Sequence, residues 1–206
     1  SSIYAKFSYL RNSRELEEID KINFNRIYYK EADQSDLEDA LANLTDFLFK
    51  HHKTKVIILI DEYDAPIIKS WEHKYYDVCI SFMRNFLGEA LKTNENLDFA
   101  ILTGVTRVSK ESIFSGLNNF DVCSVLSNRF CDLFGFTNDE VEELLQCYNI
   151  PDKIDEIREW YDGYIFGKCE IYNPWSIMKY LQEDCVAKSY WINTSDNIIL
   201  NNLLMN

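Results

Sequence analysis

The chain has 206 residues, of which 47% are hydrophobic, and a formal net charge of −13 at pH 7. This length suits one α/β domain, or one domain with a small appendage. The negative charge argues against a nucleic-acid-binding face or a direct role on anionic membranes, because phosphate contacts need clustered lysine and arginine. No apolar stretch approaches the roughly 20 residues that span a bilayer, and the amino terminus lacks the layout of a signal peptide. We therefore expect a cytoplasmic protein.

The cysteines and histidines give little support for a metal or redox centre. Six cysteines are scattered along the chain without a Cys-x-x-Cys pair, so zinc and dithiol sites are not indicated. We expect the cysteines to be reduced core residues. His51 and His52 follow a helical pattern, at an end where cations are favourable. We interpret all three histidines as structural.

The first predicted elements are a helix from about Ser35 to His52 and the strand that follows it. Residues 35–38 fit a capping box. After that, leucines recur on one face of the helix, at positions 37, 41, 44 and 48. Residues 56–60 are all aliphatic, which is typical of a parallel strand covered on both faces.

This strand ends abruptly in Asp61, Glu62 and Asp64. In α/β sheets, ligands bind at the carboxyl ends of strands. In P-loop NTPases the carboxylate that closes such a strand, at the Walker B position, helps to hold Mg²⁺, and a following glutamate can polarise the attacking water. The alternative is that Asp61 caps a helix or turn and that the acids are simply solvated.

A second helix is predicted from about residue 75 to residue 91, followed by an apolar strand at residues 99–102. Strand, crossover helix and strand form a βαβ unit, so the two strands should be parallel. Thr103, Thr106 and Arg107 follow the second strand and should therefore lie beside Asp61 and Glu62. Either threonine can bond a water or a terminal phosphate, and Arg107 can neutralise charge in phosphoryl transfer. A polar turn with a surface arginine explains the same spacing equally well.

The second half of the chain has a different character, and we place the boundary between a core (1–135) and a helical subdomain (136–206). Residues 121–125 suggest a short strand. A capping box at residues 137–140 and acidic helices near 138–147 and 152–161 follow, and Asn173 before Pro174 marks another helix start. Tyrosines, Phe166 and Trp175 cluster between 161 and 175, which favours a small core over a base-stacking site.

The chain lacks the phosphate-binding motif G-x-x-x-x-G-K-[ST]. The nearest approximation, at residues 163–169, has one residue too few between its glycines and a cysteine where serine or threonine is needed. It also follows a helix rather than a strand.

Four sequence blocks together resemble the bacterial AAA-ATPase-like family, and the resemblance covers most of the chain from about Ser35. The blocks are residues 56–66, 102–119, 160–164 and 172–176. The resemblance implies a Walker B role for Asp61 in binding Mg²⁺, a water-activating role for Glu62, and sensor-like roles for Thr103 and Arg107. It also implies that the 160–176 region belongs to a helical lid. Family members typically carry a Walker A loop before this part and a PD-(D/E)XK nuclease-like domain after it, and neither is present in these residues.

From these observations we expect an α/β fold, with a partial parallel P-loop NTPase-like sheet flanked by helices and followed by a small helical lid. The first residue is Ser1 rather than methionine, which is consistent with the second half of an ATPase-like domain. A central strand supplied by residues 1–50 would contradict that hypothesis. The parent protein should bind Mg²⁺ and ATP and hydrolyse ATP slowly, as a switch on an attached effector. The isolated chain should bind nucleotide very weakly, without turnover.

Two other functions fit the sequence. A metal-dependent phosphodiesterase would bind its metal directly through Asp61, Glu62 and Asp64. A non-enzymatic interaction module would use its acidic helices to bind a protein partner.

Overall fold

The computed structural model of the protein describes residues 2–105, 113–114 and 120–190. The chain divides into two compact units, Ser1–Phe120 and Asp121–Asn206. Residues 121–135, which we placed in the amino-terminal core from the sequence, belong to the second of these units. Each unit has its own buried core.

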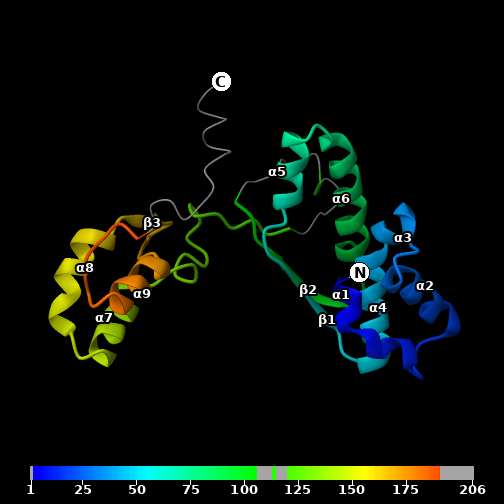
Figure 1. Cartoon of the computed structure of the whole chain (residues 1–206), viewed down its shortest axis with the longest axis horizontal. Coiled ribbons are helices and arrows are strands. Elements are labelled where there is room, and N and C mark those ends of the chain that lie inside the picture. The colour runs from blue at the N-terminus through cyan, green and yellow to red at the C-terminus, as the bar shows by residue number, and fades with distance from the viewer. Residues whose placement is uncertain (1, 106–112, 115–119, 191–206) are drawn as a thin grey trace. The chain divides into compact units, whose positions relative to one another are not determined.

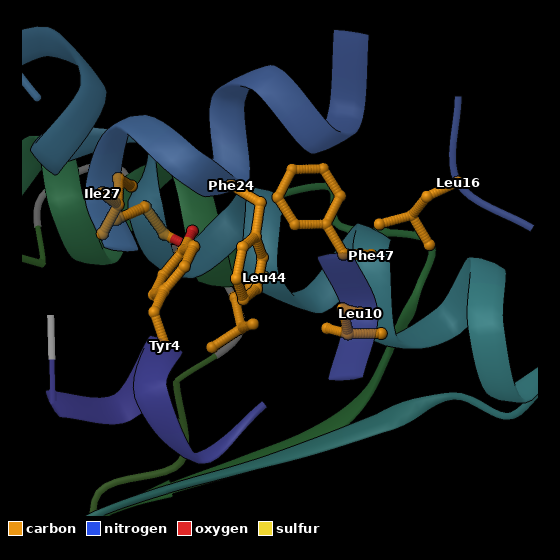
Figure 2. Close-up of a cluster of buried hydrophobic side chains, with 8 residues drawn as sticks. Tyr4, Leu10, Leu16, Phe24, Ile27, Leu44 and Phe47 are labelled. Atoms are coloured by element: carbon orange, nitrogen blue, oxygen red, sulfur yellow. The ribbon is translucent and has the colours of Figure 1, made fainter. Parts of the chain in front are cut away.

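The first unit begins with helices, and no strand occurs among the described residues before residue 56. The helices are α1 (Ser2–Lys6), the 3₁₀ helix η1 (Ser8–Asn12), α2 (Glu18–Tyr28), α3 (Gln34–Glu38) and α4 (Ala40–His52). Aromatic and aliphatic side chains from these helices and from the connection between η1 and α2 pack into one cluster (Figure 2), which contains Tyr4, Leu10, Leu16, Phe24, Ile27, Ala40, Leu44 and Phe47. The described part of 1–50 therefore supplies no strand to the sheet.

The predicted helix from Ser35 to His52 is divided into two, and its predicted cap is wrong. α3 begins at Gln34, and Asp33 caps it by accepting a hydrogen bond from the Asp36 N–H at 2.9 Å. Asp36 in turn accepts from the Asp33 N–H at 3.0 Å, so the capping box starts two residues earlier. Aspartate is as good a cap as serine, and here two aspartate side chains satisfy one amide each. α4 ends at His52, as expected.

The βαβ unit is confirmed. β1 (Val56–Ile60) is followed by α5 (Ala65–Glu72), α6 (Tyr76–Leu91) and β2 (Leu97–Leu102). The two strands lie side by side (Figure 1) and pair in parallel, from Ile57 opposite Phe99 to Ile60 opposite Leu102. α6 buries the apolar face that its sequence predicts, including Ile80, Met83 and Leu87. The first unit is thus a parallel sheet flanked by helices.

Only one face of this sheet is covered by the described residues, which contradicts the expectation of a strand covered on both faces. Ile58 is 6% exposed on the covered face. On the opposite face, Leu59 is 70% exposed and its cross-strand neighbour Ile101 is 52% exposed. Ile57 and Phe99 form the neighbouring pair on that face, and both are also exposed. We call these four side chains the open sheet face.

The second unit is a small helical group with one antiparallel hairpin. It contains α7 (Asn138–Cys147), the 3₁₀ helix η2 (Pro151–Lys153), α8 (Ile154–Tyr161), β3 (Tyr164–Phe166), β4 (Cys169–Ile171) and α9 (Pro174–Gln182). The Thr137 and Asn173 caps are confirmed by hydrogen bonds from the Glu140 and Ser176 amides. Tyr161 and Tyr172 are buried in the unit's core, as the core interpretation of the aromatic cluster requires. Tyr164 and Trp175 are exposed instead.

Two predictions for the second unit are wrong. Residues 121–125 form no strand, because Ser124 and Ser127 make local turn hydrogen bonds that compete with strand pairing. Cys131 and Cys169 form a disulfide with their Cα atoms 5.8 Å apart, so these two cysteines are not reduced. The pairing was not predictable because their sequence separation of 38 residues leaves no local signal.

Candidate functional site

The carboxyl ends of β1 and β2 are joined by backbone hydrogen bonds that continue beyond the strands. The Thr103 N–H donates to the Ile60 carbonyl, and the Tyr63 N–H donates to the Thr103 carbonyl, both at 2.9 Å. Between these contacts Glu62 adopts a left-handed backbone conformation, with φ of 53°. Such a conformation is uncommon outside glycine and costs free energy. The surrounding hydrogen bonds hold a sharp turn at this edge of the sheet.

The Thr103 side chain connects the two predicted acidic residues. Its hydroxyl donates a hydrogen bond to Asp61 Oδ1. The Thr103 hydroxyl oxygen in turn accepts a hydrogen bond from the Glu62 N–H at 3.3 Å. The structure therefore brings Asp61, Glu62 and Thr103 together at one edge, as the parallel arrangement predicted.

Asp61 and Glu62 are both exposed, so their carboxylates are accessible to a ligand in solution. Carboxylate and hydroxyl oxygens are the ligands that Mg²⁺ prefers, and Mg²⁺ commonly keeps several waters while it binds one or two carboxylates and substrate phosphates. Among the described residues, no group of three or more histidine, cysteine, aspartate or glutamate side chains is placed to hold a metal. The arrangement fits a hydrated Mg²⁺ shared with a phosphate better than an all-protein metal cage.

Asp64 differs from the other two acids because it is buried, with 1% of its surface exposed. It occupies the position before α5, yet its carboxylate makes no capping hydrogen bond to that helix. Instead it lies against Gly104: a Cβ added to Gly104 would lie 2.8 Å from Asp64 Oδ1 and 2.7 Å from Tyr63 Cε1. Sequence reasoning missed this close contact. The available signal was a glycine directly after Thr103.

Thr106 and Arg107, the other two residues predicted for this edge, lie outside the described residues.

The histidines near the amino-terminal helices have protein partners. His51 hydrogen-bonds the Ser13 hydroxyl and His52 hydrogen-bonds the Tyr9 hydroxyl, both at 2.8 Å. No helix in the described part of the chain is both long enough and apolar enough to cross a membrane.

Comparison with known proteins places the site within a matched region. The model of a family described as predicted AAA-ATPase matches residues 5–114, more than half of the chain, including Asp61, Glu62 and Thr103. An uncharacterized protein in the vnfD 5′ region of Azotobacter chroococcum mcd 1 is 34% identical over 151 residues. These residues cover 73% of this chain but 29% of that relative, so the chain spans less than a third of the relative's length. No solved structure matches the chain. The extent of the family match shows that this chain belongs to the predicted AAA-ATPase-like family.

Proposed function

We propose that this chain is the Walker B part of an ATPase module that binds Mg²⁺ and ATP and hydrolyses ATP slowly, as a switch on an effector in the same protein. The observation that carries the proposal is the Thr103 hydroxyl, which bonds both Asp61 and the Glu62 amide where two parallel strands end. Ligands of open α/β sheets bind at this edge. Family membership supports the same class of chemistry.

Each residue has a defined part in the proposed mechanism. Asp61 orients a hydrated Mg²⁺, which neutralises phosphate charge when it is bound. Glu62 is exposed next to it and polarises the attacking water. Thr103 holds Asp61 in place and senses the terminal phosphate. Arg107, for which the family resemblance implies a sensor-like role, stabilises charge in the transition state in this proposal.

The module needs a phosphate-binding loop, which these residues do not contain. We propose that a segment of the same protein, outside these 206 residues, supplies a strand and a Walker A loop. The open sheet face supports this proposal, because α/β sheets are normally covered on both faces and two-stranded sheets have little stability of their own. The larger size of the curated relative is also consistent with it. A nuclease-like domain is the proposed effector, and a cytoplasmic location completes the proposal.

The experiment that tests this function is replacement of Glu62 by glutamine in the complete natural gene product. We expect ATP hydrolysis to fall by at least about a hundredfold, as for loss of a general base, while ATP binding stays within about threefold of wild type. Asp98→Asn, at an exposed position on β2, is the matched control and should leave both properties unchanged. Unchanged hydrolysis by the Glu62→Gln variant would refute the assigned role.

The open sheet face also favours a second function, that of a non-enzymatic interaction module, because exposed apolar surface commonly marks a protein interface. A complete gene product that binds neither Mg²⁺ nor ATP would point to this function. A metal-dependent phosphodiesterase has less support, because Asp64 is buried while Asp61 and Glu62 are exposed. The three acids are therefore not presented together to solvent.

A further inference from the structure

The buried carboxylate of Asp64 has no part in the proposed phosphate chemistry, and its position needs an explanation. A buried charged group is costly unless it is paired or hydrogen-bonded, so a carboxylate at 1% exposure is a specific feature of this edge. The α5 amino terminus does not use it, since the Asp64 side chain accepts no capping hydrogen bond. Only the Asp64 main-chain carbonyl serves that helix, accepting from the Ile67 and Ile68 amides.

The turn at the end of β1 directs this side chain towards the residues that follow β2. Glu62 bends the chain through its left-handed conformation, and the Tyr63 N–H donates a hydrogen bond to the Thr103 carbonyl. Asp64 and Tyr63 thereby reach Gly104 so closely that a Cβ on Gly104 would lie less than 3 Å from atoms of both side chains. Tyr63, itself 9% exposed, packs in the core formed with α5 and α6.

We infer that Asp64 is a positioning residue, whose buried carboxylate holds the Thr103–Gly104 backbone against the end of β1. The Thr103 hydroxyl is thereby kept between Asp61 and the Glu62 amide. This inference rests on the proposed function only for its consequence in ATP hydrolysis, because the positioning itself is a property of the folded chain. Asp64 touches no reacting atom in this account and acts through Thr103.

Amide hydrogen exchange of the 206-residue chain tests the positioning without any nucleotide. The informative amides are those of Tyr63 and Thr103, which join the two strand ends. In Asp64→Asn, which keeps the side-chain volume but removes the charge, we expect protection of these two amides to fall at least about tenfold. Amides in the middle of the β1–β2 ladder should keep their protection. Asp98→Asn removes an exposed charge from β2 and should change neither set.

Two results of this experiment would overturn the inference. One is unchanged protection of the Tyr63 and Thr103 amides in Asp64→Asn. The other is an equal loss at every protected amide of the first unit, which would mean that Asp64 contributes only to global stability. If Asp64→Asn does not fold, Asp64→Glu provides a second test, because it keeps the charge but moves the carboxylate by one methylene group from its position against Gly104. It should loosen the same two amides selectively.

Kinetics of the complete gene product separate this inference from the proposed function. Asp64→Asn should lower kcat for ATP hydrolysis at least about tenfold and leave KM within about twofold, because Asp64 contacts no substrate and its replacement acts by misplacing Thr103. A wild-type product without ATP hydrolysis would refute the proposed function, whereas the exchange result would still decide the role of Asp64. A change confined to KM would overturn the positioning role.

Discussion

Two adjacent residues of β1 provide a direct test of the open sheet face. Ile58 is 6% exposed and Leu59 is 70% exposed, because successive residues of a strand point to opposite faces. Replacing each by alanine removes aliphatic side-chain carbons from the same strand. Each substitution also lowers the β-propensity at its position, which changes the free energy of unfolding by no more than about 1 kcal/mol. The two variants therefore control for each other, and they differ mainly in how much contact each side chain makes.

The expected magnitudes follow from this difference in burial. Ile58→Ala removes a buried side chain and should lower the free energy of unfolding by about 2–5 kcal/mol. Complete burial of leucine stabilises by about 1.5–3 kcal/mol. Since Leu59 is 70% exposed, Leu59→Ala should cost only about 0.5–1 kcal/mol in burial. We thus expect the Ile58 variant to be less stable than the Leu59 variant by roughly 2 kcal/mol.

Urea denaturation of the 206-residue chain, followed by circular dichroism and analysed by linear extrapolation, measures both values. Equal losses for the two variants would refute the assignment of an open face. The same pair in the complete gene product tests the proposed additional segment. There the cost of Leu59→Ala should rise into the range of about 2–5 kcal/mol, because a covering segment would bury the side chain. A cost that stays below about 1 kcal/mol would mean that nothing covers this face.

Three further predictions concern the site, the alkaline stability and the disulfide. Thr103→Val removes two hydrogen bonds at an edge that includes exposed acids and should lower the free energy of unfolding by about 1 kcal/mol. Thr103→Ser keeps the hydroxyl and should have the wild-type free energy of unfolding. An equal loss in both variants would contradict a role of the hydroxyl. Burial raises the pKa of Tyr4 above its ordinary value of 10.0. The unfolded tyrosine therefore ionises first, so stability should be unaffected below about pH 10 and should fall as the pH rises above it. Tyr4→Phe loses the 2.7 Å hydrogen bond to the Ala40 carbonyl but should show a shallower alkaline decline, and an unchanged slope would exclude Tyr4 as the cause. Cys131→Ser opens a disulfide spanning 38 residues and should destabilise the second unit by about 4 kcal/mol under non-reducing conditions; a dithiol reductant should reproduce the effect in wild type, and a wild-type chain with both thiols free would contradict the disulfide.

Sequence patterns were informative where local signals and burial agree. The helix at Tyr76–Leu91 and the parallel strands on either side of it follow from aliphatic periodicity. The caps at Thr137 and Asn173 depend only on neighbouring residues. The association of Asp61 with Thr103 followed from the parallel arrangement, because the carboxyl ends of neighbouring parallel strands meet at one edge.

The missed features depend on contacts that short windows of sequence do not encode. The burial of Asp64 against Gly104 joins residues separated by 40 positions and depends on the left-handed conformation of Glu62. The helices before residue 35 pack through aromatic side chains such as Tyr4 and Phe24 rather than through a simple leucine repeat. The open sheet face was unpredictable for a different reason. An aliphatic strand indicates that both faces prefer to be covered, but it does not reveal which polypeptide segment covers them.

The central claim is that Asp61 belongs to a Mg²⁺-dependent ATP site that residues outside this chain complete. The most direct measurement is calorimetric titration of ATP into the complete natural gene product, with and without Mg²⁺, for wild type and Asp61→Asn, beside the 206-residue chain. We predict Mg²⁺-dependent binding by the wild-type product, at least about tenfold weaker binding by Asp61→Asn, and no measurable binding by the 206-residue chain. The claim would be contradicted if the complete product did not bind ATP, or if its binding depended on neither Mg²⁺ nor Asp61.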